Sequence, residues 1–274
     1  MFKRNINTKY IIGVCMMLFF SFFALLPIIW SLILAFRPTT HLFRPIWESP
    51  TALTLENFDT LLGSNFPLAL FNSFITAGTS TGLALILGIP AGFALAKGRS
   101  QKKFIASWAL LLLRMAPPVG FVIPLFLIYL NVGLLDTWVG LIAAYMVLTL
   151  PLVVWSTWTS MSQIPNELIE AALIDGASMK QTLLKVVIPT ARPGIIATAV
   201  LAFLIVWNDF FFALIITRSD TITAPVAIMN FVSYASVNWG SIALASIVLT
   251  LPTVPIIIFA NKYIVQSMGG AVKG

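Results

Sequence analysis

Long apolar runs with almost no charge dominate this chain, and they limit what it can fold into. Residues 10–36 contain no charged side chain at all. A helix needs about 20 mostly apolar residues to cross the roughly 30 Å hydrocarbon core of a bilayer. The sequence predicts six crossings of this kind, at about residues 10–36, 71–96, 104–129, 138–158, 193–217 and 241–261.

Composition agrees with a lipid environment. Only 9% of the 274 residues are charged and 59% are hydrophobic, with a mean hydropathy of +0.98, whereas soluble domains carry about 25% charged residues. In lipid the backbone must satisfy its own hydrogen bonds, which favours helices. We therefore expect an all-α membrane protein with six transmembrane helices, forming one membrane domain over residues 1–274.

The net charge of +7 follows from topology. Basic residues gather in cytoplasmic loops of membrane proteins, and an even number of crossings puts both termini on one side. That side would hold Lys3, Arg4, Lys9, Lys97, Arg99, Lys102, Lys103, Lys180, Lys185, Arg192, Lys262 and Lys273, and the other side Arg37, Arg44 and Arg218. We expect both termini in the cytoplasm, no nucleic-acid partner, and a first helix that is retained rather than cleaved as a signal peptide.

Glycine spacing predicts where helices pack closely. Gly78 and Gly82, and again Gly88 and Gly92, are four residues apart within one predicted span. Small residues at this spacing let two membrane helices approach each other. Both pairs are therefore predicted packing positions.

The loop at about residues 160–192 is polar and expected in the cytoplasm. Pro165 and Glu167 suit the first turn of a short helix, and Gly176 should end it because glycine turns freely there. Ser178 can cap a second short helix, which Pro189 should stop. These features alone fit an ordinary connector between spans as well as a surface for another protein.

The residue pattern of this loop is more specific. Glu170-Ala171-Ala172, then Gly176, then Ile188-Pro189 resemble the EAA signature of ABC importer permeases. Val186 and Ile188 stand where the signature has Ile and Leu, which is a conservative departure. The extension Asp175-Gly176-Ala177 is similar to the carbohydrate-uptake (maltose-type) branch of that family.

The resemblance continues along the chain. Pro117-Pro118, the stretch 133–137 and Trp207-Asn208-Asp209-Phe210 are similar to the same branch, in which relatives often carry Glu at the position of Asp209. A C-terminal cytoplasmic tail is expected at residues 262–274, and its end, residues 269–274, resembles that of the maltose-type permease, whose C-terminus enters the ATPase dimer. The resemblance implies a type I ABC importer permease in a bacterial or archaeal plasma membrane. It also implies partners: a second homologous permease, two ABC ATPase subunits and an extracytoplasmic solute-binding protein.

The resemblance also assigns roles to residues. Those expected to couple to the ATPase are Glu167, Glu170, Ala171, Ala172, Asp175, Gly176 and Pro189, and those expected in the tail contact are Gly269, Gly270 and Lys273. The chain has no Gly-x4-Gly-Lys-[Ser/Thr] phosphate loop. We expect that it binds no cofactor or metal and is not itself an enzyme, and that the partner ATPases use the ATP and magnesium.

Three polar residues fall inside predicted spans. A charge deep in the bilayer costs roughly 2.5 kcal/mol or more and should face the bundle interior. Arg114, Asn208 and Asp209 therefore fit either the lining of a solute pathway or a structural pair or permease–permease contact. The substrate stays open: a sugar is favoured, with glycerol-phosphate, a polyol, a peptide or an amino acid as alternatives.

Two other protein classes fit less well. Gly78-Thr79-Ser80-Thr81-Gly82 matches a Gly-x-Ser-x-Gly pattern, but it lies in a predicted span rather than at a strand-to-helix turn. His41 is the single histidine, so a membrane-embedded hydrolase is disfavoured. A secondary transporter would work without ATP or partners, and it would leave the EAA loop without a role.

Overall fold

The computed structural model describes residues 8–41, 45, 53–98, 102–115, 117–233 and 237–269. Regular structure in these residues is helical, apart from one isolated antiparallel bridge between Val232 and Val237. The predicted all-α class is confirmed. The chain packs as two compact units, residues 1–67 with 228–251 and residues 68–227 with 252–274, and the expectation of one permease domain over residues 1–274 stays a prediction.

The first unit is built around two long helices. Its elements are α1 (Thr8–Ala35), η1 (Thr39–His41), α2 (Glu56–Leu62), η4 (Ile228–Phe231) and α13 (Trp239–Thr250). α1 and α2 each pack against α13. The buried Asn57 of α2 donates from Nδ2 to the carbonyls of Ala35 (2.9 Å) and Arg37 (3.1 Å), so it holds the end of α1.

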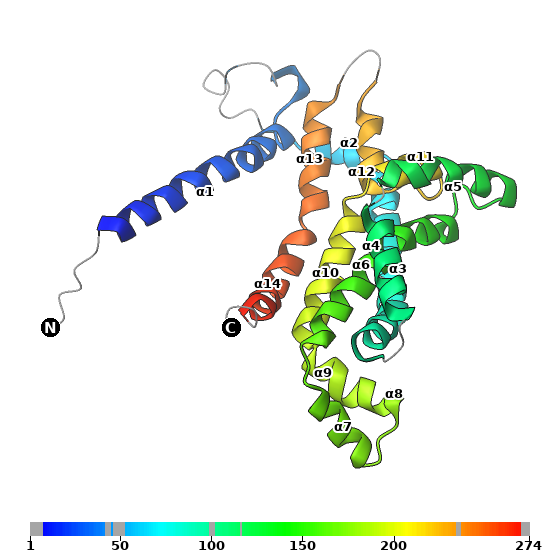
Figure 1. The fold of residues 1–274 in the computed structure, drawn as a ribbon. Coiled ribbons are helices and arrows are strands. Elements are labelled where there is room, and N and C mark those ends of the chain that lie inside the picture. The colour runs from blue at the N-terminus through cyan, green and yellow to red at the C-terminus, as the bar shows by residue number, and fades with distance from the viewer. Residues whose placement is uncertain are drawn as a thin grey trace. The chain divides into compact units, whose positions relative to one another are not determined.

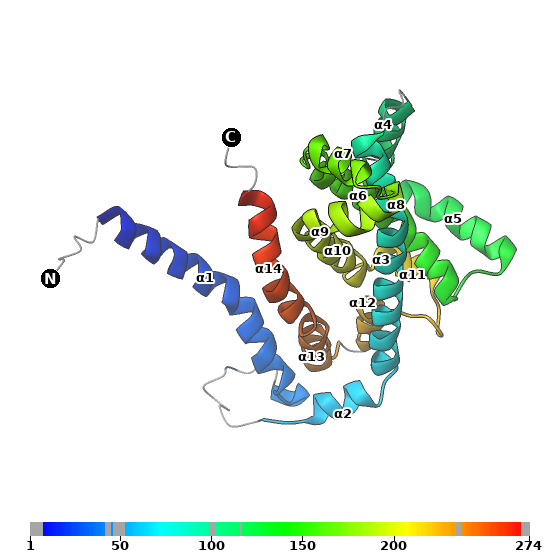
Figure 2. The same ribbon diagram turned by 90° about the horizontal axis from the view of Figure 1, so that it is seen from below.

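The second unit contains the remaining helices (Figures 1 and 2). They are α3 (Phe66–Lys97), α4 (Lys102–Met115), α5 (Pro118–Val132), α6 (Trp138–Ser162), α7 (Asn166–Ile174), α8 (Met179–Thr182), η3 (Leu183–Val187, a π-helix), α9 (Ile188–Thr190), α10 (Arg192–Trp207), α11 (Phe211–Ile216), α12 (Ala224–Ala227) and α14 (Thr253–Gly269). α10 packs against α6 and α14. Figure 1 shows α7 and α8 at one end of this unit and α11 and α12 toward the other.

One glycine pair brings α3 and α6 together. A Cβ built on Gly88 would lie 2.6 Å from Val153 Cγ1, and one on Gly92 would lie 2.8 Å from Trp158 N. Thr157 Oγ1 also donates to the Gly88 carbonyl at 3.2 Å. The predicted packing is confirmed for this pair. It is absent at Gly78 and Gly82, where an added Cβ meets nothing within 4 Å in the described residues.

In the described residues, four helices are long and apolar enough to cross a membrane: Ile11–Ala35, Phe66–Lys97, Trp138–Ser162 and Trp239–Tyr263. A fifth candidate is a bent pair, Met179–Thr190 with Arg192–Trp207, whose axes differ by 81°. The count of six unbroken helices is therefore not reproduced.

Two predicted spans are interrupted in the structure. The run at 104–129 divides into α4 and α5, because Pro117 is extended (ψ 134°) and Pro118 begins α5, where its missing N–H costs nothing. The run at 193–217 divides at Asn208–Phe210 into α10 and α11. A count of apolar residues does not reveal such breaks.

Candidate functional site

The short helix predicted after Pro165 exists, and it ends where the sequence indicates. α7 follows Pro165, and its C-terminal end carries the paired hydrogen bonds of a Schellman motif. Gly176 N donates to the Leu173 carbonyl (3.1 Å) and Ala177 N to the Ala172 carbonyl (3.0 Å). Gly176 has φ +84°, a conformation that costs other residues about 1–2 kcal/mol. The predicted helix and its termination by glycine are confirmed.

α7 has one buried side chain and an exposed outer face. Ile169 is buried in an apolar cluster with Phe93, Met161 and Val187. Of the residues predicted to couple to an ATPase, all are exposed except the half-buried Ala172: Glu167, Glu170, Ala171, Asp175, Gly176 and Pro189. Ile174 is 86% exposed. α7 thus presents carboxylates beside uncovered apolar side chains, a combination typical of a protein-binding surface.

The chain after Gly176 begins a second helical segment. Ser178 caps α8 with a capping box, since its hydroxyl accepts from Gln181 N and the Gln181 side chain accepts from Ser178 N. The prediction that Pro189 ends this segment is wrong by a short distance. Pro189 lies in the last turn of the continuous helical segment Met179–Thr190, and the chain turns after Thr190.

A second set of contacts lies at the α11 end of the unit, in the turn between α5 and α6. Asp136 Oδ1 accepts from Arg218 N (2.9 Å), Thr221 N (3.0 Å) and Thr221 Oγ1 (2.8 Å). Asp136 Oδ2 accepts from Ser219 N and Asp220 N, both at 3.1 Å. One carboxylate thus holds the start of the segment that follows α11.

The electrostatics of Asp136 follow from these donors. Partial burial acts to raise the pKa of its carboxyl, but the hydrogen bonds from Arg218, Asp220 and Thr221 outweigh burial and hold the pKa far below its ordinary value. In the sequence, Asp136 stands out only as part of the stretch 133–137 that resembles importer permeases, and this role was not predicted. The residues next to Asp136 in the sequence do not indicate that its carboxylate binds a segment more than eighty positions away.

α3 holds the same segment from its other side. The buried Asn72 amide donates to the carbonyls of Asp220 and Ile222, both at 3.0 Å, and its Oδ1 accepts from Trp138 Nε1 at 3.0 Å. Ser73 Oγ accepts from Ala224 N at 2.9 Å. The segment 218–224 is therefore fixed by side chains of α3 and of the α5–α6 turn.

Two of the predicted membrane polar residues, Asn208 and Asp209, lie together in the break between α10 and α11, and the third, Arg114, lies on another helix. Asp209 Oδ2 accepts from Phe212 N (3.0 Å) and Ala213 N (3.3 Å), so it caps α11 next to the buried Tyr145. Asn208 is exposed and donates to the Leu204 carbonyl. Arg114 lies on α4. Of the predicted tail contacts, Gly269 ends α14, and Gly270 and Lys273 lie outside the described residues.

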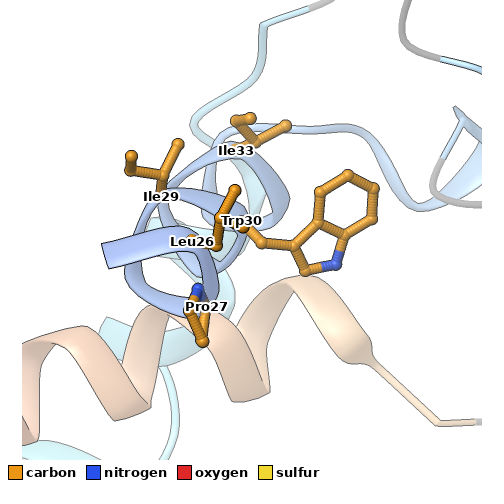
Figure 3. Close-up of a pocket in the computed structure, with 5 residues that line it drawn as sticks. All are labelled: Leu26, Pro27, Ile29, Trp30 and Ile33. Atoms are coloured by element: carbon orange, nitrogen blue, oxygen red, sulfur yellow. The ribbon is translucent and has the colours of Figure 1, made fainter. Parts of the chain in front are cut away.

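One cavity in the first unit is apolar and open. A volume of about 390 Å³ lies on α1 beside Leu26, Pro27, Ile29, Trp30 and Ile33, and Figure 3 shows Trp30 extending sideways from the helix. Solute sites combine apolar walls with a few polar groups that orient the ligand. None of these five side chains supplies such a group apart from the indole N–H of Trp30, so this surface suits lipid or another helix rather than a polar solute.

Comparisons with known proteins cover nearly the whole chain. Residues 84–269 match the sequence profile of the family described as binding-protein-dependent transport system inner membrane component. The trehalose transport system permease protein SugB of Mycobacterium tuberculosis is 37% identical, covering 92% of this chain and 93% of the relative. The trehalose/maltose transport system permease protein MalG of Thermococcus litoralis is 33% identical, covering 96% of each.

Solved structures share the fold. A chain from a bacterial ABC transporter involved in the import of the acidic polysaccharide alginate superposes with a TM-score of 0.76 at 20% identity, covering 96% of this chain and 99% of that one. A chain of the MetNI methionine ABC transporter gives a TM-score of 0.61 at 16% identity, covering 73% and 94%. At these identities the likeness concerns the fold alone.

Proposed function

This chain belongs to the family of binding-protein-dependent transport system inner membrane components, and we propose that the importer it serves takes up a neutral disaccharide such as trehalose. The chain is the permease subunit of an ABC importer and not its ATPase. The disaccharide is supported by the two relatives named for trehalose and for trehalose/maltose, each matched over more than 90% of its length. A third relative, from Streptomyces coelicolor, is named for uptake of diacetylchitobiose, which is also a disaccharide.

The exposed α7 carries the mechanistic part of this proposal. An ATP-driven importer must pass movement from cytoplasmic ATPases into the membrane helices. α7 offers Glu167, Glu170 and Asp175 on an open face, and Ile169 joins it to α3 and α6. ATPase closure would displace α7 through this face and so change which side of the membrane the helices open to.

The remaining partners complete the assembly. A second homologous permease would pair with this chain to enclose the solute pathway, and an extracytoplasmic solute-binding protein would deliver the sugar. Two ATPase subunits would use ATP and magnesium. Both termini would be cytoplasmic in a bacterial or archaeal plasma membrane, as the distribution of Lys and Arg favours, and the tail with Gly269, Gly270 and Lys273 would reach the ATPases.

The break between α10 and α11 is the candidate solute-facing part of this chain. Irregular backbone at membrane depth is tolerated where it lines a cavity or is buried in protein. The exposed Asn208 amide is available there to a sugar hydroxyl, and Asp209 would fix the break by capping α11. Arg114 stays a further candidate for the pathway, on α4.

Affinity purification of the tagged chain from its native membranes tests this function, followed by uptake of labelled trehalose in proteoliposomes. We expect a second permease, an ATPase and a solute-binding protein in the preparation, and uptake that requires ATP inside. Uptake by this chain alone, without ATP, would contradict the proposal and indicate a secondary transporter.

A further inference from the structure

The N-terminal end of α7 is hydrogen-bonded to the last residue of α3. Lys97 Nζ donates to the Ile164 carbonyl and to Asn166 Oδ1, the latter at 2.9 Å. These two acceptors lie on either side of Pro165, the residue from which α7 starts. An ammonium has three donors and no acceptor, so a single lysine can hold both sides of this entry turn.

The rest of α7 is only partly supported by α3. Within α7, all of which the structure describes, Ile169 is the buried side chain. A cavity of about 880 Å³ opens beside it, and Lys97, Ile169, Glu170 and Leu173 are among its lining residues. The C-terminal half of α7 therefore borders a hollow rather than a packed surface of α3.

α7 packs against α8 and η3 of the same loop, and Ile169 joins it to the apolar cluster on α3 and α6. Without a further attachment to α3, a push on its outer face could rotate α7 about the Ile169 contact. Pro165 precedes α7 and Gly176 follows it, and neither residue continues the helix into the neighbouring chain. A second attachment, at a different point along the helix, prevents this rotation. The Lys97 hydrogen bonds supply that second attachment at the end opposite to Gly176.

We propose that Lys97 is a positioning residue for energy coupling: it holds the start of α7 on α3, so that displacement of the face from Glu170 to Gly176 moves α3. This inference rests on the proposed importer function. It differs from anchoring to lipid headgroups, the usual role of a lysine at the end of a membrane helix, because the Lys97 ammonium is directed to two protein acceptors.

The test uses the whole importer in proteoliposomes with its solute-binding protein and trehalose as the transported probe. Trehalose uptake and ATP hydrolysis are measured on the same preparation, which gives the number of sugars moved per ATP. K97M removes the ammonium and keeps an apolar stem, whereas K97R keeps a cationic donor. K262M removes an exposed lysine from α14 and is the matched control.

For K97M we expect the number of sugars per ATP to fall at least about fivefold, the lower range of coupling between distant sites, while ATP hydrolysis stays within about twofold. K97R should recover most of the ratio, and K262M should leave it unchanged. An unchanged ratio in K97M overturns the inference. A parallel fall of uptake and hydrolysis in an intact complex also overturns it, because a general structural defect gives that pattern.

If the K97M complex does not assemble, N166A tests the inference instead. This variant removes one acceptor and keeps the bond to the Ile164 carbonyl, so we expect a ratio lower by about twofold. An unchanged ratio in N166A overturns the inference. Wild-type complex that shows no ATP-dependent uptake contradicts the proposed function and the inference together, whereas wild-type uptake with unchanged variants contradicts the inference alone.

Discussion

Asp136 accepts two hydrogen bonds from Thr221, one from its backbone N–H at 3.0 Å and one from its hydroxyl at 2.8 Å. Together with the bonds from residues 218–220, these connect the α5–α6 turn to the chain after α11. Asp136 itself has φ +54°, in the left-handed region that Asp and Asn adopt more often than other residues with a side chain. The hydrogen bonds therefore also hold this turn in its left-handed conformation.

Asp136→Asn should destabilise the protein. The substitution removes the charge that strengthens several hydrogen bonds and replaces one acceptor oxygen by a donor that faces N–H groups. We expect a loss of about 1.5–3 kcal/mol, the range for hydrogen bonds to a charged group. Thermal unfolding of the purified complex measures this loss. Asp59→Asn, at an exposed carboxylate of α2, is the control and should leave the unfolding temperature unchanged.

The same carboxylate predicts a pH dependence. The pKa of Asp136 is lowered in the folded protein, so its contribution is fully present above the pKa of the unfolded chain, about 3.9. It is lost as the pH falls through the lower folded-state pKa. The difference in unfolding temperature between wild type and Asp136→Asn should thus be constant from about pH 5 to 8 and shrink below about pH 4. A difference that varies near neutral pH would contradict this assignment.

Gly176→Ala should weaken the end of α7 through the backbone alone. Among the described residues an added Cβ meets nothing within 4 Å, but φ is +84°, and the cost should be about 1–2 kcal/mol. Gly176→Val should reduce stability more than Gly176→Ala does. It should also reduce the rate of transport more than it reduces the rate of ATP hydrolysis. Gly13→Ala in α1, where a Cβ also meets nothing within 4 Å, is the control. Equal effects of Gly13→Ala and Gly176→Ala would argue against a special role for this turn.

Gly92→Ala should separate α3 from α6. Its Cβ would overlap the Thr157 side chain and the Trp158 backbone, and overpacking of this kind costs about 1–3 kcal/mol. A Cβ added at Gly82, on the same helix, meets nothing within 4 Å in the described part of the chain, so Gly82→Ala should be close to neutral. Unfolding temperatures of the two variants give the comparison. Equal stability of both would mean that the close approach at Gly92 is not required.

Local signals in the sequence predicted the helical class and the ends of several helices. Each depends on a single continuous segment of the chain: the apolar length of 138–158 predicted α6, Gly176 predicted the end of α7, and Ser178 predicted the cap of α8. The Glu170-Ala171-Ala172 pattern pointed to the surface that α7 exposes. These features need no information about distant parts of the chain.

The tertiary structure decided which residues from distant segments meet. Asp136 binds residues 218–221 and Lys97 binds the entry to α7. A Cβ added at Gly92 would meet α6, whereas one added at Gly82 on the same helix would meet nothing within 4 Å among the described residues. Composition and periodicity are the same for a glycine that faces a neighbouring helix and one that does not. Partitioning into a membrane and helix formation follow from the sequence because each depends on one segment alone. The contacts between distant residues depend on how the segments pack against one another, and only the folded chain specifies that packing.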